Sequence, residues 1–235
     1  MHLDEGADDR PPICATCGVT MVPGALSADE DHEGEWVCLE CEELALETSG
    51  RSAGPEDDPV IVREQQADDY EAIRHVYAEA FRRPGFRPPQ SPGSVPPEVG
   101  LFAALWQAGD AIPELSFTAL SDPGVVGHVT ASRATVADDP VVAVGPIGVL
   151  PDHQGAGIGS ALMDALLTAA DAADVPLVVL LGAPRYYSRF GFRPAEELGV
   201  MPPEPEWEDA FQARPLTAYT DALAGPFRYA PAFSS

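Results

Sequence analysis

The chain has 235 residues, which is enough for one well-packed domain with a small appendage or for two modest domains. Its 38 acidic residues outnumber its 13 basic residues, all of them arginines, and the formal net charge is -25. Nucleic acids and anionic membrane surfaces are polyanions, so this charge excludes both as expected partners. A cationic acceptor such as an amine is compatible with it, as is a general acidic bias of the source proteome.

Neither a membrane span nor a secretory signal is expected. No run of 18 or more apolar residues occurs in the chain, and residues 1–10 are polar and acidic rather than basic and then apolar. We therefore expect a cytoplasmic protein that makes no membrane contact.

Four cysteines near the start of the chain form two Cys-x2-Cys pairs, Cys14 with Cys17 and Cys38 with Cys41, with twenty residues between the pairs. This spacing is typical of a four-thiolate zinc ribbon and predicts a metal site in residues 10–50. Four thiolates close the coordination sphere, so we expect a structural zinc ion, with iron as the main alternative. What the ribbon does stays open, and docking of a protein partner is one alternative.

Residues 51–58 are rich in Gly, Pro, Ser and acidic side chains, which predicts a solvated linker between the ribbon and a domain at 59–235. The patterns after it predict a strand at 60–63, a helix at 67–81 and an irregular segment at 82–113 that contains one helix at 99–108. A hairpin of strands 114–120 and 125–131 follows, joined by a Ser-Asp-Pro-Gly turn. Further expected elements are a strand at 141–150, a helix at 158–173, a strand at 177–181, a short helix at 184–190 and late strands around 192 and 211–216. The order predicts a mixed α/β fold.

A glycine-rich loop connects the strand at 141–150 to the helix at 158–173. The loop residues are Gln154, Gly155, Ala156, Gly157, Ile158, Gly159 and Ser160. Free backbone N–H groups and the helix dipole at such a helix start bind anions, and glycines allow a phosphate to approach closely. The loop lacks the Gly-Lys-Ser/Thr ending of a nucleotide P-loop, and its glycine order differs from the dinucleotide fingerprint. On the glycines alone, a purely structural turn remains an equal alternative.

The surrounding residues resemble the GNAT acyltransferase superfamily over roughly residues 59–235. The segment Gln154-x-x-Gly157-x-Gly159, after a strand that ends at 147–151, is similar to the pyrophosphate motif of that family. Residues 185–192 (RYYSRFGF) are similar to its Tyr-x-x-x-Gly-Phe segment. The segment at 181–192, together with the C-terminal segment at 228–233, looks most similar to the YhbS-like branch of the family.

The resemblance implies a GNAT-type mixed, twisted sheet flanked by helices and splayed open where Val149 ends its strand. It implies that acetyl-CoA binds there, with its pantetheine arm along the backbone of Ile147 and Val149 and its pyrophosphate on the amides of Gln154 to Ser160. An amine would attack the thioester directly, and a backbone N–H near Val149 would stabilise the oxyanion.

Tyr187 matches the family tyrosine that protonates the departing thiolate, and a phenol is protonated at working pH. A packing role for Tyr187, or an exchange of roles with Tyr186, is the alternative. The base that deprotonates the amine stays open among His128, His153, Asp152 and water, and the carboxylates of Glu79, Asp138 and Asp139 cannot be ranked.

The resulting expectation is an N-acetyltransferase that acts on a primary amine of a small molecule. Two alternatives remain open: a non-catalytic acyl-CoA-binding or interaction module, and a protein N-acetyltransferase.

Overall fold

The computed structural model describes residues 22–23, 36–37, 60–82, 95–122 and 124–234. The chain divides into two units, Met1–Asp57 and Asp58–Ser235. In the first unit, the short strands β1 (Val22–Pro23) and β2 (Trp36–Val37) pair antiparallel. The four cysteines of the predicted ribbon and the predicted linker 51–58 lie outside the described residues.

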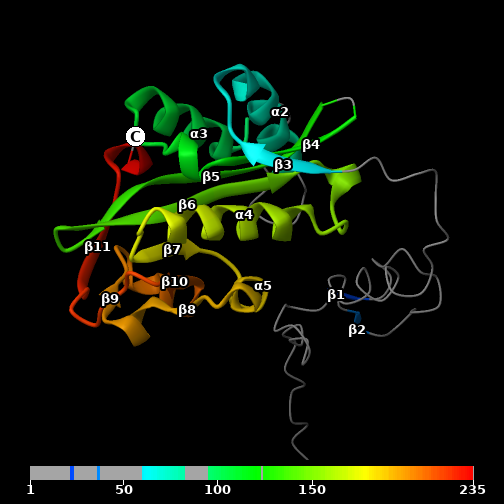
Figure 1. Cartoon of the computed structure of the whole chain (residues 1–235). Helices are drawn as coiled ribbons and strands as arrows, with labels where there is room; N and C mark the ends of the chain where they lie inside the picture. Colours follow the sequence, from blue (N-terminus) through cyan, green and yellow to red (C-terminus); the bar gives the residue numbers. More distant parts are fainter. Residues whose placement is uncertain (1–21, 24–35, 38–59, 83–94, 123, 235) are drawn as a thin grey trace, which may run out of the picture. The chain divides into compact units, whose positions relative to one another are not determined.

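The second unit contains a sheet, four α-helices and several short 3-10 turns (Figure 1). The strands are β3 (Ile61–Glu64), β4 (Phe117–Ser121), β5 (Gly124–Val136), β6 (Asp139–Val149), β7 (Leu177–Leu181), β8 (Arg193–Pro194), β9 (Val200–Met201), β10 (Phe211–Pro215) and β11 (Gly225–Tyr229). The α-helices are α2 (Tyr70–Ala80), α3 (Pro97–Ala108), α4 (Ile158–Ala172) and α5 (Pro184–Tyr187). The 3-10 turns are η3 (Ala67–Asp69), η4 (Pro113–Leu115), η5 (Pro151–His153), η6 (Ser188–Phe190), η7 (Ala195–Leu198), η8 (Pro205–Ala210) and η9 (Pro231–Ser234).

The sheet has the strand order β3-β4-β5-β6-β7-β10-β8, and β11 pairs with the far half of β5 and with β9. All pairs along this order are antiparallel except β6 and β7, which run parallel. The sheet is therefore mixed, as the sequence predicts. The crossover between β6 and β7 is made by the glycine-rich loop and α4, so this connection brings the predicted anion site to the centre of the sheet.

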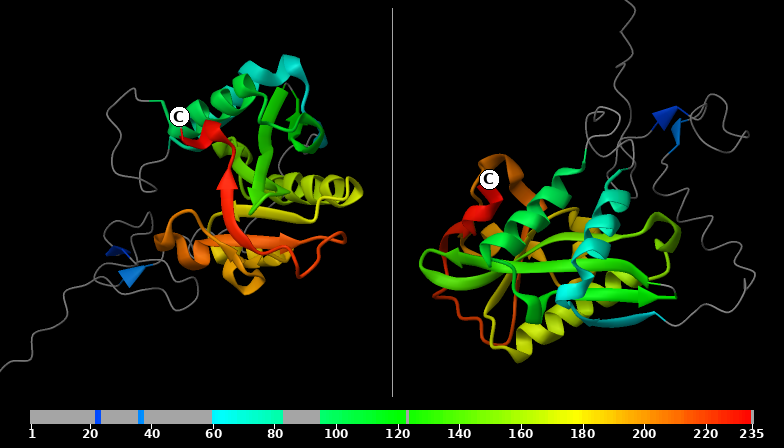
Figure 2. Two further views of the ribbon diagram at one scale, coloured as in Figure 1. Left: turned by 90° about the vertical axis from the view of Figure 1, so that its left-hand side faces the viewer. Right: turned by 90° about the horizontal axis from the view of Figure 1, so that it is seen from above.

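Helices cover both faces of this sheet (Figure 2). A Cβ atom added at Gly127 on β5 would lie 3.1 Å from Ile158 of α4, whereas one added at Gly148 on β6 would lie 3.0 Å from Tyr77 of α2. Gly127 is paired with Val149, the residue after Gly148 on β6. Because neighbouring residues of a strand point to opposite faces, α4 packs on one face of the sheet and α2 on the other. The strand β5 is accordingly buried on both sides through most of its length.

The sequence explains why the helices form where they do. Asp68 and Asp69 precede α2, and Asp69 accepts a hydrogen bond from the backbone N–H of Gln66 at 2.8 Å, which stabilises the helix start. Helix α3 begins at Pro97 and ends at Gly109, which adopts the left-handed conformation with φ +72°. Helix α4 buries an apolar stripe at Ile158, Leu162, Met163, Leu166, Leu167 and Ala170.

The predicted elements correspond to observed ones with shifted ends. The predicted helix at 67–81 begins with a 3-10 turn, and the predicted strand at 125–131 continues to Val136 as the long strand β5. The predicted irregular segment contains α3, while residues 83–94 lie outside the described part. Strands β9 and β11 are not among the predicted elements. Among the described residues, no helix is long and apolar enough to cross a bilayer.

Candidate active site

The strands β6 and β7 separate in the middle of the sheet. Their register runs from Val142 opposite Val178 to Val144 opposite Leu180 and ends there. Strand β6 continues to Val149 with pairing to β5 alone, while β7 ends at Leu181. The backbone of residues 145–149 therefore has one edge that the sheet does not pair, and the predicted site residues Ile147 and Val149 lie on this edge.

The glycine-rich loop begins directly after that edge. The Gln154 side-chain amide donates to the carbonyl oxygen of Val149 at 2.9 Å and closes the turn between strand and loop. Gly155 and Gly157 adopt positive φ angles of +74° and +81°, which glycine reaches without steric penalty. Gly157 is the N-cap of α4, so the first N–H groups of that helix are free to face an anion.

The end of β7 is held on its other side by β10. The N–H of Gly182 donates to the carbonyl of Ala210 at 2.9 Å, and the buried side chain of Gln212 donates to the carbonyl of Gly182 at 2.9 Å. A Cβ atom at Gly182 would lie 2.3 Å from Cε2 of Tyr187, so one edge of the Tyr187 ring lies directly against this glycine. Gly182 thus gives the predicted catalytic tyrosine its place at the opening between the strands.

Tyr187 is held in its neutral form. Burial, followed by the neighbouring Tyr186, raises the pKa of Tyr187 to about 12. Among the residues that the structure describes, no side chain or backbone group forms a hydrogen bond with its hydroxyl. The hydroxyl is therefore a protonated donor without a fixed acceptor at neutral pH.

Tyr186 contacts the glycine-rich loop itself. A Cβ at Gly159 would lie 2.8 Å from the Tyr186 hydroxyl, so this hydroxyl lies against the backbone of the loop. The guanidinium of Arg189 lies 4.7 Å from the Tyr186 ring centroid, and the Tyr186 and Tyr187 rings meet edge-on at 4.9 Å. The two tyrosines join the loop to the end of β7. Sequence reasoning left their roles interchangeable, because only the fold shows which ring faces the loop.

The candidate bases have different surroundings. His128 is fully buried on β5, and burial lowers its pKa to about 3, so it is neutral and shielded from solvent. Asp152 is exposed in the turn after β6, and Glu79 forms an ion pair with Arg82 at 2.9 Å.

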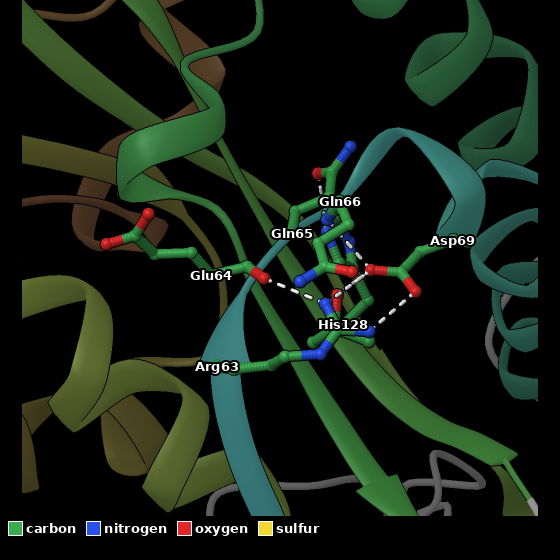
Figure 3. Close-up of polar contacts among 7 residues, drawn as sticks. Arg63, Glu64, Gln65, Gln66, Asp69 and His128 are labelled. Carbon is green, nitrogen blue, oxygen red and sulfur yellow. Dashed lines mark hydrogen bonds and ion pairs between the residues drawn. The ribbon is translucent and has the colours of Figure 1, made fainter.

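His128 belongs to a buried polar cluster between β3, β5 and α2. Its Nε2 lies 2.8 Å from Oε1 of Gln65, and its Nδ1 lies 2.6 Å from the hydroxyl of Tyr77. Figure 3 shows Gln65 and His128 beside Asp69, which forms two hydrogen bonds with Arg63. Sequence reasoning missed Tyr77 and Gln65, because single polar residues inside apolar patterns carry no motif. Within the described ranges, no group of three His, Cys, Asp or Glu side chains could hold a metal ion.

Comparisons with known proteins agree with this architecture. The sequence profile of the acetyltransferase (GNAT) family matches residues 70–192. The uncharacterized N-acetyltransferase YjhQ of Escherichia coli is 33% identical over 141 residues, covering 57% of this chain and 78% of YjhQ. The uncharacterized N-acetyltransferase YhbS of Escherichia coli is 34% identical over 119 residues, covering 49% of this chain and 70% of YhbS.

Two solved structures resemble this one. The crystal structure of Escherichia coli YhbS in complex with CoA matches with a TM-score of 0.66 and 25% identity, covering 79% of this chain and 97% of that one. A GNAT family acetyltransferase from Brucella melitensis in complex with acetyl-CoA matches with a TM-score of 0.60 and 28% identity, covering 75% of this chain and 99% of that one. The open mixed sheet, the glycine-rich crossover and these relatives agree, and the chain belongs to the acetyltransferase (GNAT) family.

Proposed function

We propose that this protein transfers the acetyl group of acetyl-CoA to a primary amine of a small molecule by direct attack in a ternary complex. The observation that carries the proposal is the unpaired edge of β6, which leads without interruption into the glycine-rich loop and the start of α4. The relatives from Escherichia coli and Brucella melitensis, with CoA and acetyl-CoA respectively, support the choice of cofactor.

The cofactor would use this edge as an added strand. The amide groups of a pantetheine arm can pair with the backbone groups of Ile147 and with the N–H of Val149, as a further strand would. The carbonyl oxygen of Val149 already accepts a hydrogen bond from Gln154. The pyrophosphate would then lie on the N–H groups between Gln154 and Ser160, which include the first turn of α4. A protein with a net charge of -25 needs such a local device to hold a polyanion.

Acetyl transfer requires two hydrogen-bond donors at the opening between β6 and β7. A backbone N–H near Val149 would donate to the thioester oxygen as it gains negative charge. The Tyr187 phenol, held neutral by its burial, would donate its proton to the sulfur as the thiolate leaves. The amine would lose its own proton to water or to an acceptor-side group, since His128 is buried and neutral.

An acceptor screen tests the proposal. The full chain is incubated with acetyl-CoA and a panel of small primary amines, amino acids and short peptides, and release of the free thiol is followed. The proposal expects turnover with small amines. Turnover with peptides alone would favour the protein N-acetyltransferase, and CoA binding without turnover on any amine would favour the non-catalytic module.

For the segment before residue 59, we propose a structural zinc ribbon at 10–50, joined by the linker 51–58 to the transferase domain at 59–235. Support comes from the spacing of Cys14, Cys17, Cys38 and Cys41 and from the pairing of β1 with β2 between the two cysteine pairs. Val37, which directly precedes Cys38, is paired with Val22, five residues after Cys17. A hairpin of this kind brings two cysteine pairs toward one ion. Metal analysis of the purified chain tests this, and one zinc per chain is expected.

A further inference from the structure

The ladder between β5 and β6 is interrupted beside the proposed thioester site. Val129 is paired with Ile147 and Ala131 with Val144, so Thr130, Gly145 and Pro146 fall within a register shift. An interruption of this kind releases backbone groups from the ladder, and a buried carbonyl then needs another donor. Pro146 directly precedes Ile147, where the edge proposed to bind the cofactor begins.

A side chain from the opposite layer supplies that donor. The hydroxyl of Tyr77 on α2 donates to the carbonyl oxygen of Pro146 at 2.8 Å, and Tyr77 is fully buried. The ring of the same residue lies on the backbone of Gly148, where an added Cβ would come within 3.0 Å of Cδ1. Tyr77 therefore holds β6 at two points, one on each side of Ile147.

The direction of the Tyr77 proton fixes the protonation of His128. Tyr77 has one proton, and its hydroxyl oxygen meets three partners: Pro146 O, His128 Nδ1 at 2.6 Å and Thr130 Oγ1 at 2.9 Å. If Tyr77 donates its proton to Pro146, its oxygen must accept the other two hydrogen bonds, from His128 Nδ1 and from Thr130 Oγ1. Neutral His128 must then carry its proton on Nδ1 and accept at Nε2.

Gln65 can satisfy this requirement. Its side-chain nitrogen is buried without a partner, while its oxygen faces His128 Nε2 at 2.8 Å. The two ends of an amide have almost the same shape, so turning it by half a rotation lets the nitrogen donate to Nε2. The Gln65 oxygen then occupies the buried position that has no hydrogen-bond partner. This costs less than leaving the nitrogen there, because proteins tolerate an unpaired carbonyl oxygen more readily than an unpaired N–H.

The backbone around Gln65 is anchored on both sides. Its N–H donates to the carbonyl of Ser116 at 2.8 Å. The next residue, Gln66, donates its N–H to the carboxylate of Asp69, which also accepts two hydrogen bonds from Arg63 (Figure 3). These hydrogen bonds fix the backbone from which the Gln65 side-chain amide reaches His128.

We propose that Tyr77, His128 and Gln65 are positioning residues for acetyl transfer. They direct the Tyr77 proton to the carbonyl of Pro146 and thereby fix the backbone from Ile147 to Val149 against which the thioester lies. This inference rests on the proposed function, because the edge of β6 matters for transfer only if acetyl-CoA binds there. It assigns a role to a histidine that is too deeply buried to act as the base.

Two measurements on the full chain test the inference. The first reads the His128 tautomer from the nitrogen-15 shifts of its imidazole, assigned with a His128→Asn variant. Nδ1 protonated and Nε2 bare is the expected result. Nε2 protonated with Nδ1 bare would overturn the inference, because the Tyr77 proton would then point at the histidine. This measurement decides even if the variants below fail to fold.

The second measurement compares Tyr77→Phe with Thr130→Val as a matched control. Each change removes one hydroxyl from the same buried cluster, but only Tyr77 contacts Pro146. The readout is the dissociation constant of CoA divided by that of acetyl-CoA, from calorimetry, with thermal unfolding measured beside it. We expect the ratio to fall by about tenfold in Tyr77→Phe and to stay unchanged in Thr130→Val, since a misplaced backbone donor affects the acetyl group first.

Loss of thermal stability with an unchanged ratio in Tyr77→Phe would contradict the inference and leave Tyr77 as a packing residue. An equal fall of the ratio in both variants would also contradict the inference, since the effect would then not depend on the hydrogen bond from Tyr77 to Pro146. Failure of the folded wild-type chain to bind either ligand would instead contradict the proposed function. The two failures are therefore distinguishable.

Discussion

At the scale of single residues, two adjacent tyrosines have different surroundings. The Tyr186 hydroxyl lies beside Gly159 in the glycine-rich loop, whereas Tyr187 lies against Gly182 and its hydroxyl has no hydrogen bond among the described residues. Burial raises the pKa of both, and Tyr187 reaches about 12. The free, protonated hydroxyl of Tyr187 suits the role of proton donor to a leaving thiolate, whereas the Tyr186 hydroxyl packs against the loop.

Replacing Tyr187 by Phe keeps the ring over Gly182 and removes only the proposed proton donor. We expect kcat to fall by about a hundredfold, the usual effect of losing a general acid, while the affinity for CoA stays within about twofold. Steady-state kinetics and calorimetry measure the two quantities. Tyr229→Phe is the control, because Tyr229 is paired with Ala134 near the far end of β5. Equal losses of kcat and affinity in Tyr187→Phe would make Tyr187 a packing residue.

His128 makes the stability of the protein depend on pH. Its folded pKa of about 3 lies below the ordinary value of 6.5, because burial disfavours the charged ring and the nearby Asp69 offsets this only in part. The unfolded chain takes up this proton as the pH falls through 6.5, and the folded chain does not. The contribution to stability is therefore present above pH 6.5 and is lost progressively toward pH 3.

Denaturant unfolding between pH 7 and 5 should show this loss, with a slope of up to about 1.4 kcal/mol per pH unit from the single histidine. His128→Asn should be less stable at pH 7 and should lose most of the slope. His75→Asn, which replaces an exposed histidine, should keep it. An unchanged slope in His128→Asn would mean that other groups cause the acid sensitivity.

At the scale of elements, the end of β7 determines where Tyr187 lies. The backbone of Gly182 is hydrogen-bonded to the carbonyl of Ala210 and to the side chain of Gln212. It therefore cannot move aside when a side chain is added. A methyl group there would come within 2.3 Å of the Tyr187 ring. The position of the predicted acid thus depends on a glycine five residues earlier, in another element.

The Gly182→Ala variant should therefore lower kcat at least as far as Tyr187→Phe does, because the whole ring is displaced. Gly124→Ala is the control, since no atom lies within 4 Å of an added Cβ there. The same thiol-release assay serves for both variants. Normal turnover in Gly182→Ala would show that the ring position is not required.

Much of this architecture follows from local sequence patterns. The helix stripe of α4, the hairpin of β4 and β5 and the loop at 154–160 are each encoded within a few residues, and the structure contains all three. The cluster of Gln65, Tyr77 and His128 joins residues up to 63 positions apart, so it depends on the tertiary fold. Strand β11 was missed for a similar reason: its partners on β5 and β9 are set by long-range pairing.

At the scale of the whole molecule, all proposed cofactor contacts lie between Ile147 and Tyr187, inside the unit Asp58–Ser235. The proposed zinc ribbon lies in the other unit. We therefore expect the ribbon to contribute its own stability without contributing to the cofactor site.

Removing the metal from the full chain with a chelator should leave the affinity for acetyl-CoA unchanged within about twofold. Zinc release is followed with a metal indicator and binding by calorimetry, with zinc added back as the control. A loss of affinity that zinc restores would contradict the separation, and release of no metal at all would contradict the ribbon.

The central claim is that the edge of β6 and the glycine-rich loop hold acetyl-CoA, and calorimetric titration of the full chain tests it most directly. Gly157→Glu places a carboxylate among the N–H groups proposed for the pyrophosphate. Gly109→Glu is the matched control, because both glycines have positive φ, +81° and +72°, with no atom within 4 Å of an added Cβ. We expect about micromolar binding in the wild type and in Gly109→Glu, and no binding in Gly157→Glu. A folded wild-type chain that does not bind, or equal losses in the two variants, would contradict it.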